Sequence, residues 1–138
     1  MTQPQRRILV VVHAHRGDNA DAARRVMQAL RAADAQPVLA PEDRADLDTL
    51  DLEGVATLGV DVDVDDIELA IVLGGDGTIL RAAELVREGT APVLGINMGH
   101  VGFLAEIERD DMDDAVHRVI ARDYEVEERL ALSVRVKD

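Results

Sequence analysis

The stretch IELAIVLGGDGTILRAA, residues 67–83, decides the fold. Its first seven residues are apolar except for Glu68, which predicts a β-strand buried on both faces. Three glycines then surround a single acid, Asp76, and apolar residues recur at helical spacing from Ile79 to Val86. A buried strand, a glycine-rich turn and an amphipathic helix in this order predict half of a βαβ unit.

The same alternation runs through most of the chain. Short apolar runs predict further strands at residues 7–12, 37–40 and 91–96. Helical spacing predicts one helix that ends before Pro37 and another over residues 110–122. Strands that alternate with helices indicate an α/β fold, so we expect an open, mostly parallel sheet flanked by helices, Rossmann-like in type.

The C-terminal residues follow a different pattern. From Tyr124 onward apolar residues alternate with polar ones, which is typical of a strand with one buried face in an antiparallel sheet. Such a strand needs partners, which either another chain or the continuation of a longer protein beyond Asp138 would supply, and we favour the second. We therefore expect residues 1–127 to form an α/β domain and residues 128–138 to open a second, all-β domain that this chain otherwise lacks.

Composition excludes several classes of protein. The chain has 138 residues, of which 47% are hydrophobic and 31% charged, as in an ordinary globular domain. It has no cysteine, so disulfides and thiolate metal sites are excluded. No apolar run is long enough for a membrane helix, and the start does not fit a signal peptide, so we expect a cytoplasmic protein that does not bind membranes.

The net charge of −13 is concentrated in one segment. Eleven acids lie between Glu42 and Glu68 with Arg44 as the one base among them. We expect residues 41–66 to be a solvated surface segment of loop and short helix. This charge repels polyanions, and the absence of tryptophan removes a stacking platform, so nucleic-acid binding is not expected.

The glycine-rich turn carries the chemistry. Residues 74–77 follow a predicted strand, so they lie at the carboxyl edge of the parallel sheet, where open α/β sheets bind their ligands. Glycines permit positive φ and let a ligand approach the backbone, and the amides at a helix N-terminus favour phosphate. Arg81 lies just beyond in the predicted helix and could add a phosphate contact.

Asp76 is the odd residue of this turn, because a carboxylate repels phosphate. It could accept the proton of an attacking hydroxyl, hold a divalent metal through water, or merely cap the helix that we expect to begin near Thr78. The common nucleotide fingerprints GxxxxGK[ST] and GxGxxG are both absent, which disfavours an ordinary P-loop protein or dehydrogenase.

Three segments together resemble the N-terminal part of bacterial NAD kinases. They are LGGDGTILRAAE at residues 73–84, PVLGINMGHVGFLAEIE at 92–108 and YEVEERLALSV at 124–134. The GGDGT motif alone is shared with lipid kinases of the diacylglycerol and sphingosine type, and more loosely with phosphofructokinases. The second segment narrows the resemblance to the NAD kinases.

This resemblance implies transfer of a phosphoryl group from ATP, or from polyphosphate, to the 2′-hydroxyl of the adenosine ribose of NAD, with Mg²⁺ as cofactor. Asp76 matches the catalytic aspartate of the family and also contacts the substrate. The other expected binding positions are Gly75, Gly77, Thr78, Arg81 and Phe103. No separate metal-ligand set is expected within the chain, and the full-length protein is expected to be a dimer or tetramer.

Part of the family's site has no counterpart before Asp138. The Asn-Glu or Asn-Asp pair that holds the NAD ribose and the glycine-rich second domain are both missing, so we expect this chain alone not to complete the reaction. Two alternatives remain open: a lipid kinase of the same superfamily, and a noncatalytic nucleotide-binding module that retains the loop.

Overall fold

The computed structural model describes residues 5–13, 19–98, 107–128 and 132–136, the last of these and residues 127 and 128 without their side chains. Its elements run in the following order: β1 (Arg6–Val12), α1 (Asn19–Ala32), β2 (Ala35–Leu39), α2 (Pro41–Asp46), β3 (Ala56–Thr57), η1 (Val64–Asp66), β4 (Leu69–Gly74), α3 (Asp76–Leu85), β5 (Val93–Asn97), β6 (Ile107–Glu108), η2 (Arg109–Asp111), α4 (Met112–Ile120), β7 (Tyr124–Glu128) and β8 (Leu132–Val136).

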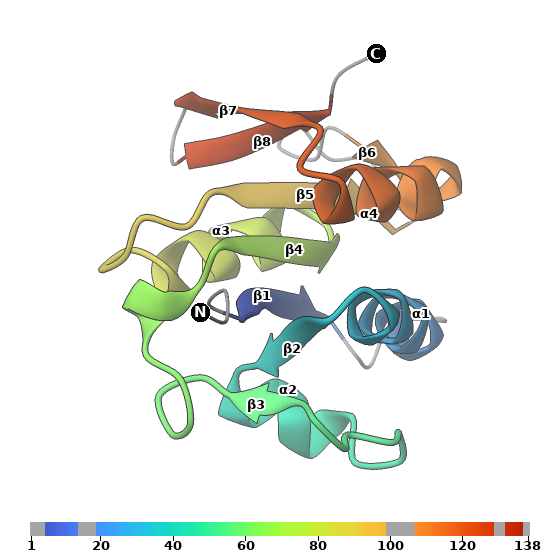
Figure 1. The fold of residues 1–138 in the computed structure, drawn as a ribbon, viewed down its shortest axis with the longest axis vertical. Helices are drawn as coiled ribbons and strands as arrows, with labels where there is room; N and C mark the ends of the chain where they lie inside the picture. Colours follow the sequence, from blue (N-terminus) through green and yellow to red (C-terminus); the bar gives the residue numbers. More distant parts are fainter. Residues whose placement is uncertain (1–4, 14–18, 99–106, 129–131, 137–138) are drawn as a thin grey trace.

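The strands form one sheet in the order β3-β2-β1-β4-β5-β8-β7, with β6 added beside β5. All pairs are parallel except β7 with β8, so the expected class, an open and mostly parallel sheet flanked by helices, is confirmed. Figure 1 shows the strands stacked along the long axis, with α1 and α4 on one side of the sheet and α3 on the other.

The two central strands are buried on both faces, as their continuous apolar runs predict. On β1, Ile8 and Val10 face one apolar cluster, and Leu9 and Val11 face the other. The first cluster contains the inward face of α1 and α4, and the second that of α3. A layer of helices on each face explains why these strands show no polar alternation.

The predicted helix of residues 110–122 is α4, which begins at Met112 after the short turn η2.

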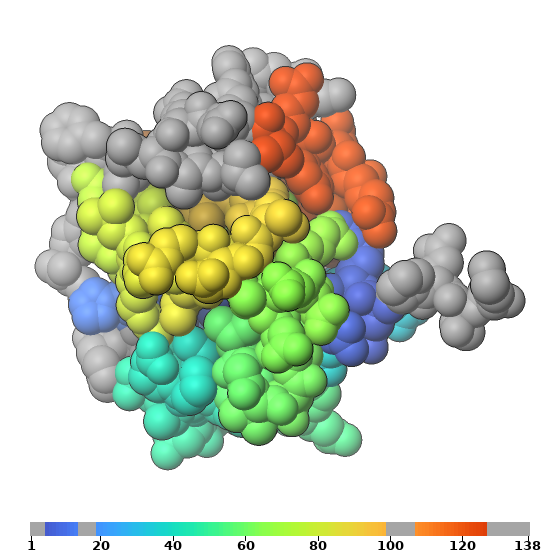
Figure 2. All heavy atoms as spheres, turned by 90° about the vertical axis from the view of Figure 1, so that its left-hand side faces the viewer, coloured from blue at the N-terminus to red at the C-terminus, as the bar shows by residue number. Residues whose placement is uncertain are grey.

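Residues 41–66 contain α2, η1 and the two-residue strand β3, which pairs with β2 and which the sequence did not predict. In Figure 2 this segment, coloured teal to green, lies beside the yellow-green and yellow residues of α3 and the turn after it. Nine of its ten acids are exposed, which supports the expectation of a solvated surface segment.

The C-terminal pattern differs from the expected single strand. It forms two strands, β7 and β8, which pair antiparallel from Tyr124 opposite Val136 to Glu128 opposite Leu132. β8 also joins the main sheet beside β5. The alternation therefore finds its antiparallel partner within this chain, although Val126 on the outer strand is 50% exposed. The division into two domains at residue 128 stays a prediction.

An arginine–carboxylate pair fastens the amino edge of the sheet. Arg6 at the start of β1 donates through Nε to Glu68 Oε1 at 2.8 Å and through Nη2 to Oε2 at 2.5 Å. The same guanidinium donates to the carbonyls of Val119 and Ile120 at the end of α4, and Tyr124 Oη lies 3.2 Å from Glu68 Oε2. One side-chain cluster thus joins β1, the segment before β4, α4 and β7.

This cluster makes the stability of the fold depend on pH. The hydrogen bonds from Arg6 lower the pKa of Glu68 below its ordinary value of 4.5. A lowered folded-state pKa stabilises the protein above pH 4.5, and the stabilisation is lost as pH falls through the lowered value. We expect Glu68→Gln to reduce the free energy of unfolding by about 1–3 kcal/mol at pH 7, because a part-buried charged hydrogen-bond network is broken.

Urea unfolding of wild type and variant between pH 7 and pH 3 measures this effect, and the difference between them should shrink toward the acid end. Asp21→Asn is the matched control, because Asp21 pairs with Arg24 on the exposed surface of α1 and is expected to change stability by less than about 1 kcal/mol. A Glu68→Gln deficit that is equally large at pH 3 would contradict the assignment.

Candidate functional site

The order of the sheet reverses between β1 and β4. The chain moves from β1 outward to β2 and β3, then returns to β4 on the other side of β1 and moves outward to β5. Ligands of open α/β sheets bind outside the carboxyl ends of the strands at such a switch point. Here β1 ends at Val12 and β4 at Gly74, so the glycine-rich turn lies at the carboxyl edge, as predicted, and the strand order makes this place the switch point.

The helix after the turn begins two residues earlier than expected, at Asp76 instead of Thr78. Gly75 is its N-cap residue, with an extended backbone at φ −108° and ψ −163°, and its carbonyl accepts the first intrahelical hydrogen bond from Ile79 N at 3.0 Å. The amides of Asp76, Gly77 and Thr78 therefore precede that first bond. A first turn of this kind, with its positive dipole end, favours an anion.

Asp76 is thus the first residue of α3, and the reading in which it caps the helix is wrong. The cap position belongs to Gly75, which has no side chain. Asp76 is half-buried at the switch point, and no other acid belongs to the first turn of α3. The roles of proton acceptor and metal contact for its carboxylate stay predictions.

The turn has glycines because of the space around them and not because of their backbone conformation. The glycines at positive φ are Gly54 and Gly59 among the described residues, and none of Gly74, Gly75 and Gly77 is among them. A Cβ on Gly74 would lie 2.5 Å from Thr78 Oγ1, so packing excludes a side chain there. A Cβ on Gly75 or Gly77 would have nothing within 4 Å, so both leave the backbone open to an approaching ligand.

Arg81 is held by two acids that sequence reasoning missed. Its Nη2 lies 2.9 Å from Glu42 Oε1 and its Nη1 lies 3.0 Å from Asp43 Oδ1. The side chain of Arg81 is 32% exposed and that of Asp43 only 3%. Asp43 Oδ2 also accepts a hydrogen bond from Val12 N, at 3.4 Å, at the carboxyl end of β1. The cluster of Glu42, Asp43 and Arg81 is called the α2–α3 clamp below.

The pKa values of the two acids in the clamp are shifted in opposite directions. Burial raises the pKa of Asp43 above its ordinary value, and the hydrogen bond from Arg81 offsets part of that rise. The pKa of Glu42 is lowered by a hydrogen bond from its own backbone amide and by Arg81. The buried carboxylate of Asp43 therefore needs Arg81 to stabilise its charge, whereas the exposed carboxylate of Glu42 is also accessible to water.

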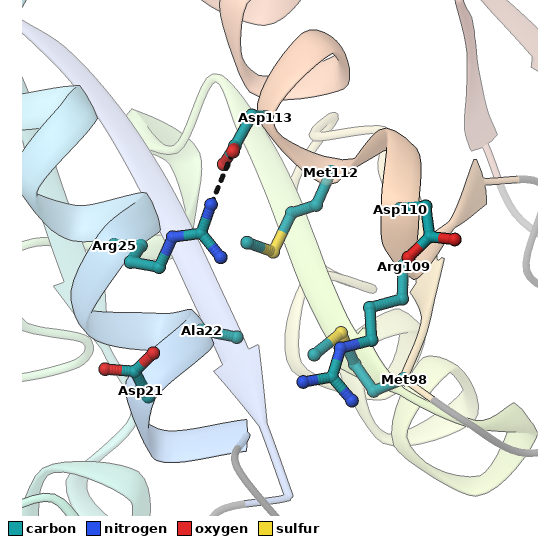
Figure 3. Close-up of a pocket in the computed structure, with 8 residues that line it drawn as sticks. All are labelled: Asp21, Ala22, Arg25, Met98, Arg109, Asp110, Met112 and Asp113. Carbon is teal, nitrogen blue, oxygen red and sulfur yellow. Dashed lines mark hydrogen bonds and ion pairs between the residues drawn. The ribbon is translucent and has the colours of Figure 1, made fainter.

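A pocket of about 240 Å³ lies between α1 and α4. Gly74 pairs with Asn97, so Met98, which lines the pocket, is level with the glycine-rich turn. Figure 3 shows α1 on one side of the pocket and η2 and α4 on the other, joined by the ion pair of Arg25 with Asp113. The lining residues are Asp21, Ala22, Arg25, Met98, Arg109, Asp110, Met112 and Asp113.

The remaining predicted positions differ in what the structure says of them. Gly75, Gly77, Thr78 and Arg81 come together with Asp76 in the first two turns of α3. Phe103 lies outside the described residues.

Within the described part of the chain, no group of three or more His, Cys, Asp or Glu side chains is arranged to hold a metal ion. Among those same residues, no helix has the length and apolar character needed to cross a bilayer.

The comparisons with known proteins all match this chain to one family. The family model for the ATP-NAD kinase N-terminal domain matches residues 8–124. A protein named NAD kinase from Leifsonia xyli is 57% identical over 135 residues, which are 96% of this chain and 44% of that protein. An NAD kinase from Mycobacterium tuberculosis is 44% identical over 148 aligned residues, which are 96% of this chain and 46% of the relative.

The solved structures include one with the same fold. Yeast NADH kinase complexed with NADH superposes with a TM-score of 0.73 and 19% identity, over 92% of this chain and 41% of the yeast chain. At this identity the match shows the fold alone. The chain spans less than half the length of the relatives reported above.

The different environments of the glycines predict opposite effects on stability. We expect Gly74→Ala to destabilise the protein by about 1–3 kcal/mol, because Thr78 must move to admit the methyl group. We expect Gly77→Ala to leave stability unchanged or raise it by up to about 1 kcal/mol, because alanine favours a helical position with open space around it. Urea unfolding of both variants measures the difference, and equal losses would contradict the geometry of the turn.

Proposed function

Since the chain belongs to the NAD kinase family, we propose that the protein transfers a phosphoryl group from ATP, or from polyphosphate, to the 2′-hydroxyl of the adenosine ribose of NAD, forming NADP. The observation that carries this proposal is the position of Asp76. It is a half-buried acid at the start of α3, at the switch point between β1 and β4, among amides that favour phosphate.

The reaction needs a base and an anion site next to each other, and the turn supplies both. The 2′-oxygen forms a bond to the terminal phosphorus of the donor while the bond from that phosphorus to the ADP leaving group breaks. Asp76 accepts the proton that the hydroxyl loses. Gly75 and Gly77 let the substrate reach the backbone because neither carries a Cβ, and the amides of Gly77 and Thr78 meet phosphate oxygens.

Arg81 and Phe103 complete the proposed contacts of this chain. Each terminal nitrogen of Arg81 uses one N–H toward an acid of the α2–α3 clamp and has a second for phosphate. Phe103, by the family resemblance, lines the adenine end of the NAD site. Mg²⁺ usually binds through one or two carboxylates together with substrate phosphates, and Asp76 fits the protein's share of such a set. The ion would offset the negative charge of the donor.

The surface charge is consistent with a small-molecule substrate. The net charge of −13 opposes binding to nucleic acids and to anionic membranes, so the proposed partners are NAD and ATP or polyphosphate, in the cytoplasm. The family resemblance further implies a dimer or tetramer. The NAD ribose contacts expected of the family have no counterpart in this sequence, so the proposal applies to the protein at the length of its relatives.

An activity assay with a variant of Asp76 tests the proposed function. The complete gene product that contains these residues is incubated with NAD, ATP and Mg²⁺, and NADP formation is measured. We expect Asp76→Asn to lower kcat by at least about 100-fold, because general-base catalysis contributes roughly 10²–10⁴-fold. Affinity for NAD should stay within about 3-fold, because asparagine keeps the shape of the side chain.

Glu84→Gln is the control for that assay. Glu84 lies on the same helix and pairs with Arg87 on the exposed surface, so its loss should leave kcat unchanged. Diacylglycerol as an alternative acceptor distinguishes a lipid kinase. Turnover by Asp76→Asn equal to that of wild type would remove the general-base role, and absence of NADP formation by wild type would overturn the proposed function.

The opening at Gly77 gives a second prediction for catalysis. We expect Gly77→Ala to lower kcat/KM for NAD by at least about 10-fold while the protein keeps or gains stability, because the methyl group occupies space that the substrate needs. Steady-state kinetics together with the melting temperature separate the two effects. Wild-type kcat/KM in this variant would show that substrate does not approach the backbone at this residue.

A further inference from the structure

Asp43 stands apart from the other acids of its segment. Of the eleven acids between Glu42 and Glu68, nine are exposed and Glu68 is half-buried, but Asp43 is only 2% exposed. A buried carboxylate is costly unless it is paired and hydrogen-bonded. Both conditions are met, because Asp43 has the guanidinium of Arg81 on one oxygen and the amide of Val12 on the other.

The contacts of Asp43 join the two layers of the fold at the site. α2 leads into Leu47, which packs in the apolar cluster that contains α1 and α4, whereas α3 packs in the cluster on the opposite face. The ion pair of Asp43 with Arg81 therefore passes over the carboxyl edge of the sheet. The amide of Val12 fixes the point of crossing at the end of β1, next to the switch point.

Stability alone does not account for such a pair. Removing two charges from water costs about as much as their attraction returns, and apolar residues of similar size often serve equally well. What the pair does supply is orientation. Together with Glu42, Asp43 engages the two terminal nitrogens of Arg81, at 2.9 and 3.0 Å, which fixes the plane of the guanidinium and the position of the helix that carries it.

We propose that Asp43 is a positioning residue for phosphoryl transfer, which acts through Arg81 to hold the first two turns of α3, and with them Asp76, against the end of β1. The inference rests on the proposed function, since it assigns Asp43 to the same site. Asp43 itself touches no reacting atom in this account. Glu42 has a smaller part, because its side chain is 58% exposed and water replaces it more easily.

Steady-state kinetics on the complete gene product test this role. Asp43→Asn keeps the shape and the hydrogen bond to Val12 but loses the charge that holds Arg81. We expect kcat to fall roughly 10–100-fold, as for a misplaced catalytic group, while KM for NAD stays within about 3-fold. Glu42→Gln should lower kcat by less than about 3-fold, and Glu84→Gln on the same helix should change neither parameter.

A double-mutant cycle shows whether Asp43 acts through Arg81. We expect Arg81→Met to lower kcat, and the double variant Asp43→Asn with Arg81→Met to be no slower than Arg81→Met alone, because the second change removes a partner already lost. If the fold-loss of kcat in the double variant equals the product of the losses in the two single variants, the proposal is overturned. So would a kcat at the wild-type level in Asp43→Asn, even with a lower melting temperature, since the pair would then only stabilise the fold.

Arg81→Lys covers the case in which Asp43→Asn does not fold. Lysine keeps a positive charge beside Asp43 but cannot engage both acids with a planar fork. We expect a lower kcat at a melting temperature near that of wild type, and a kcat equal to wild type overturns the proposal. Failure of the proposed function is distinguishable, because it appears as wild type without NADP formation, whereas an active wild type with a fully active Asp43→Asn rejects the positioning role alone.

Discussion

The pairing of β1 with β4 is the constraint on which the rest of the structure depends. Five residue pairs, from Ile8 with Leu69 to Val12 with Leu73, place these two strands side by side and in parallel. This pairing creates the reversal of strand order, because β2 and β5 then occupy the outer sides. It also brings the ends of both strands to one edge, where Asp76 emerges next to the end of β1.

Each end of β1 is fastened by an arginine and a carboxylate that come from distant parts of the chain. At the amino end Arg6 binds Glu68, and at the carboxyl end Arg81 binds Asp43, which also accepts the amide of Val12. The first pair connects elements far from the proposed chemistry. The second lies at the switch point, where the two helical layers meet over the sheet edge.

Much of this fold follows from local patterns in the sequence. Continuous apolar runs identified β1, β4 and β5, and a glycine-rich turn directly after a strand placed Asp76 at the carboxyl edge. The start of α3 was predicted two residues late, because an extended Gly75 can cap a helix as well as a residue with a polar side chain does. The C-terminal alternation predicts one strand where the structure has two, because two antiparallel strands keep the same period of two.

The sequence could not predict which acid of the acidic segment is buried, because all of these residues are alike in type. Asp43 is one of eleven acids in a segment whose composition indicates a solvated surface, and its burial depends on Arg81, which lies on another helix. The spacing of apolar and polar residues along one segment does not reveal a partner on another helix. β3 was missed for a similar reason, because two residues are too few to show an alternation and pairing with β2 alone makes them a strand.

The two ion pairs at the ends of β1 lie at opposite edges of the sheet. Substitutions of Arg6 or Glu68 remove contacts among β1, α4 and β7 without removing any at the switch point. Changes around Asp43 and Arg81 reach the turn that carries Asp76. Thermostability can therefore be engineered at the amino end of β1, because those residues lie at the opposite end of the strand from the turn that carries Asp76.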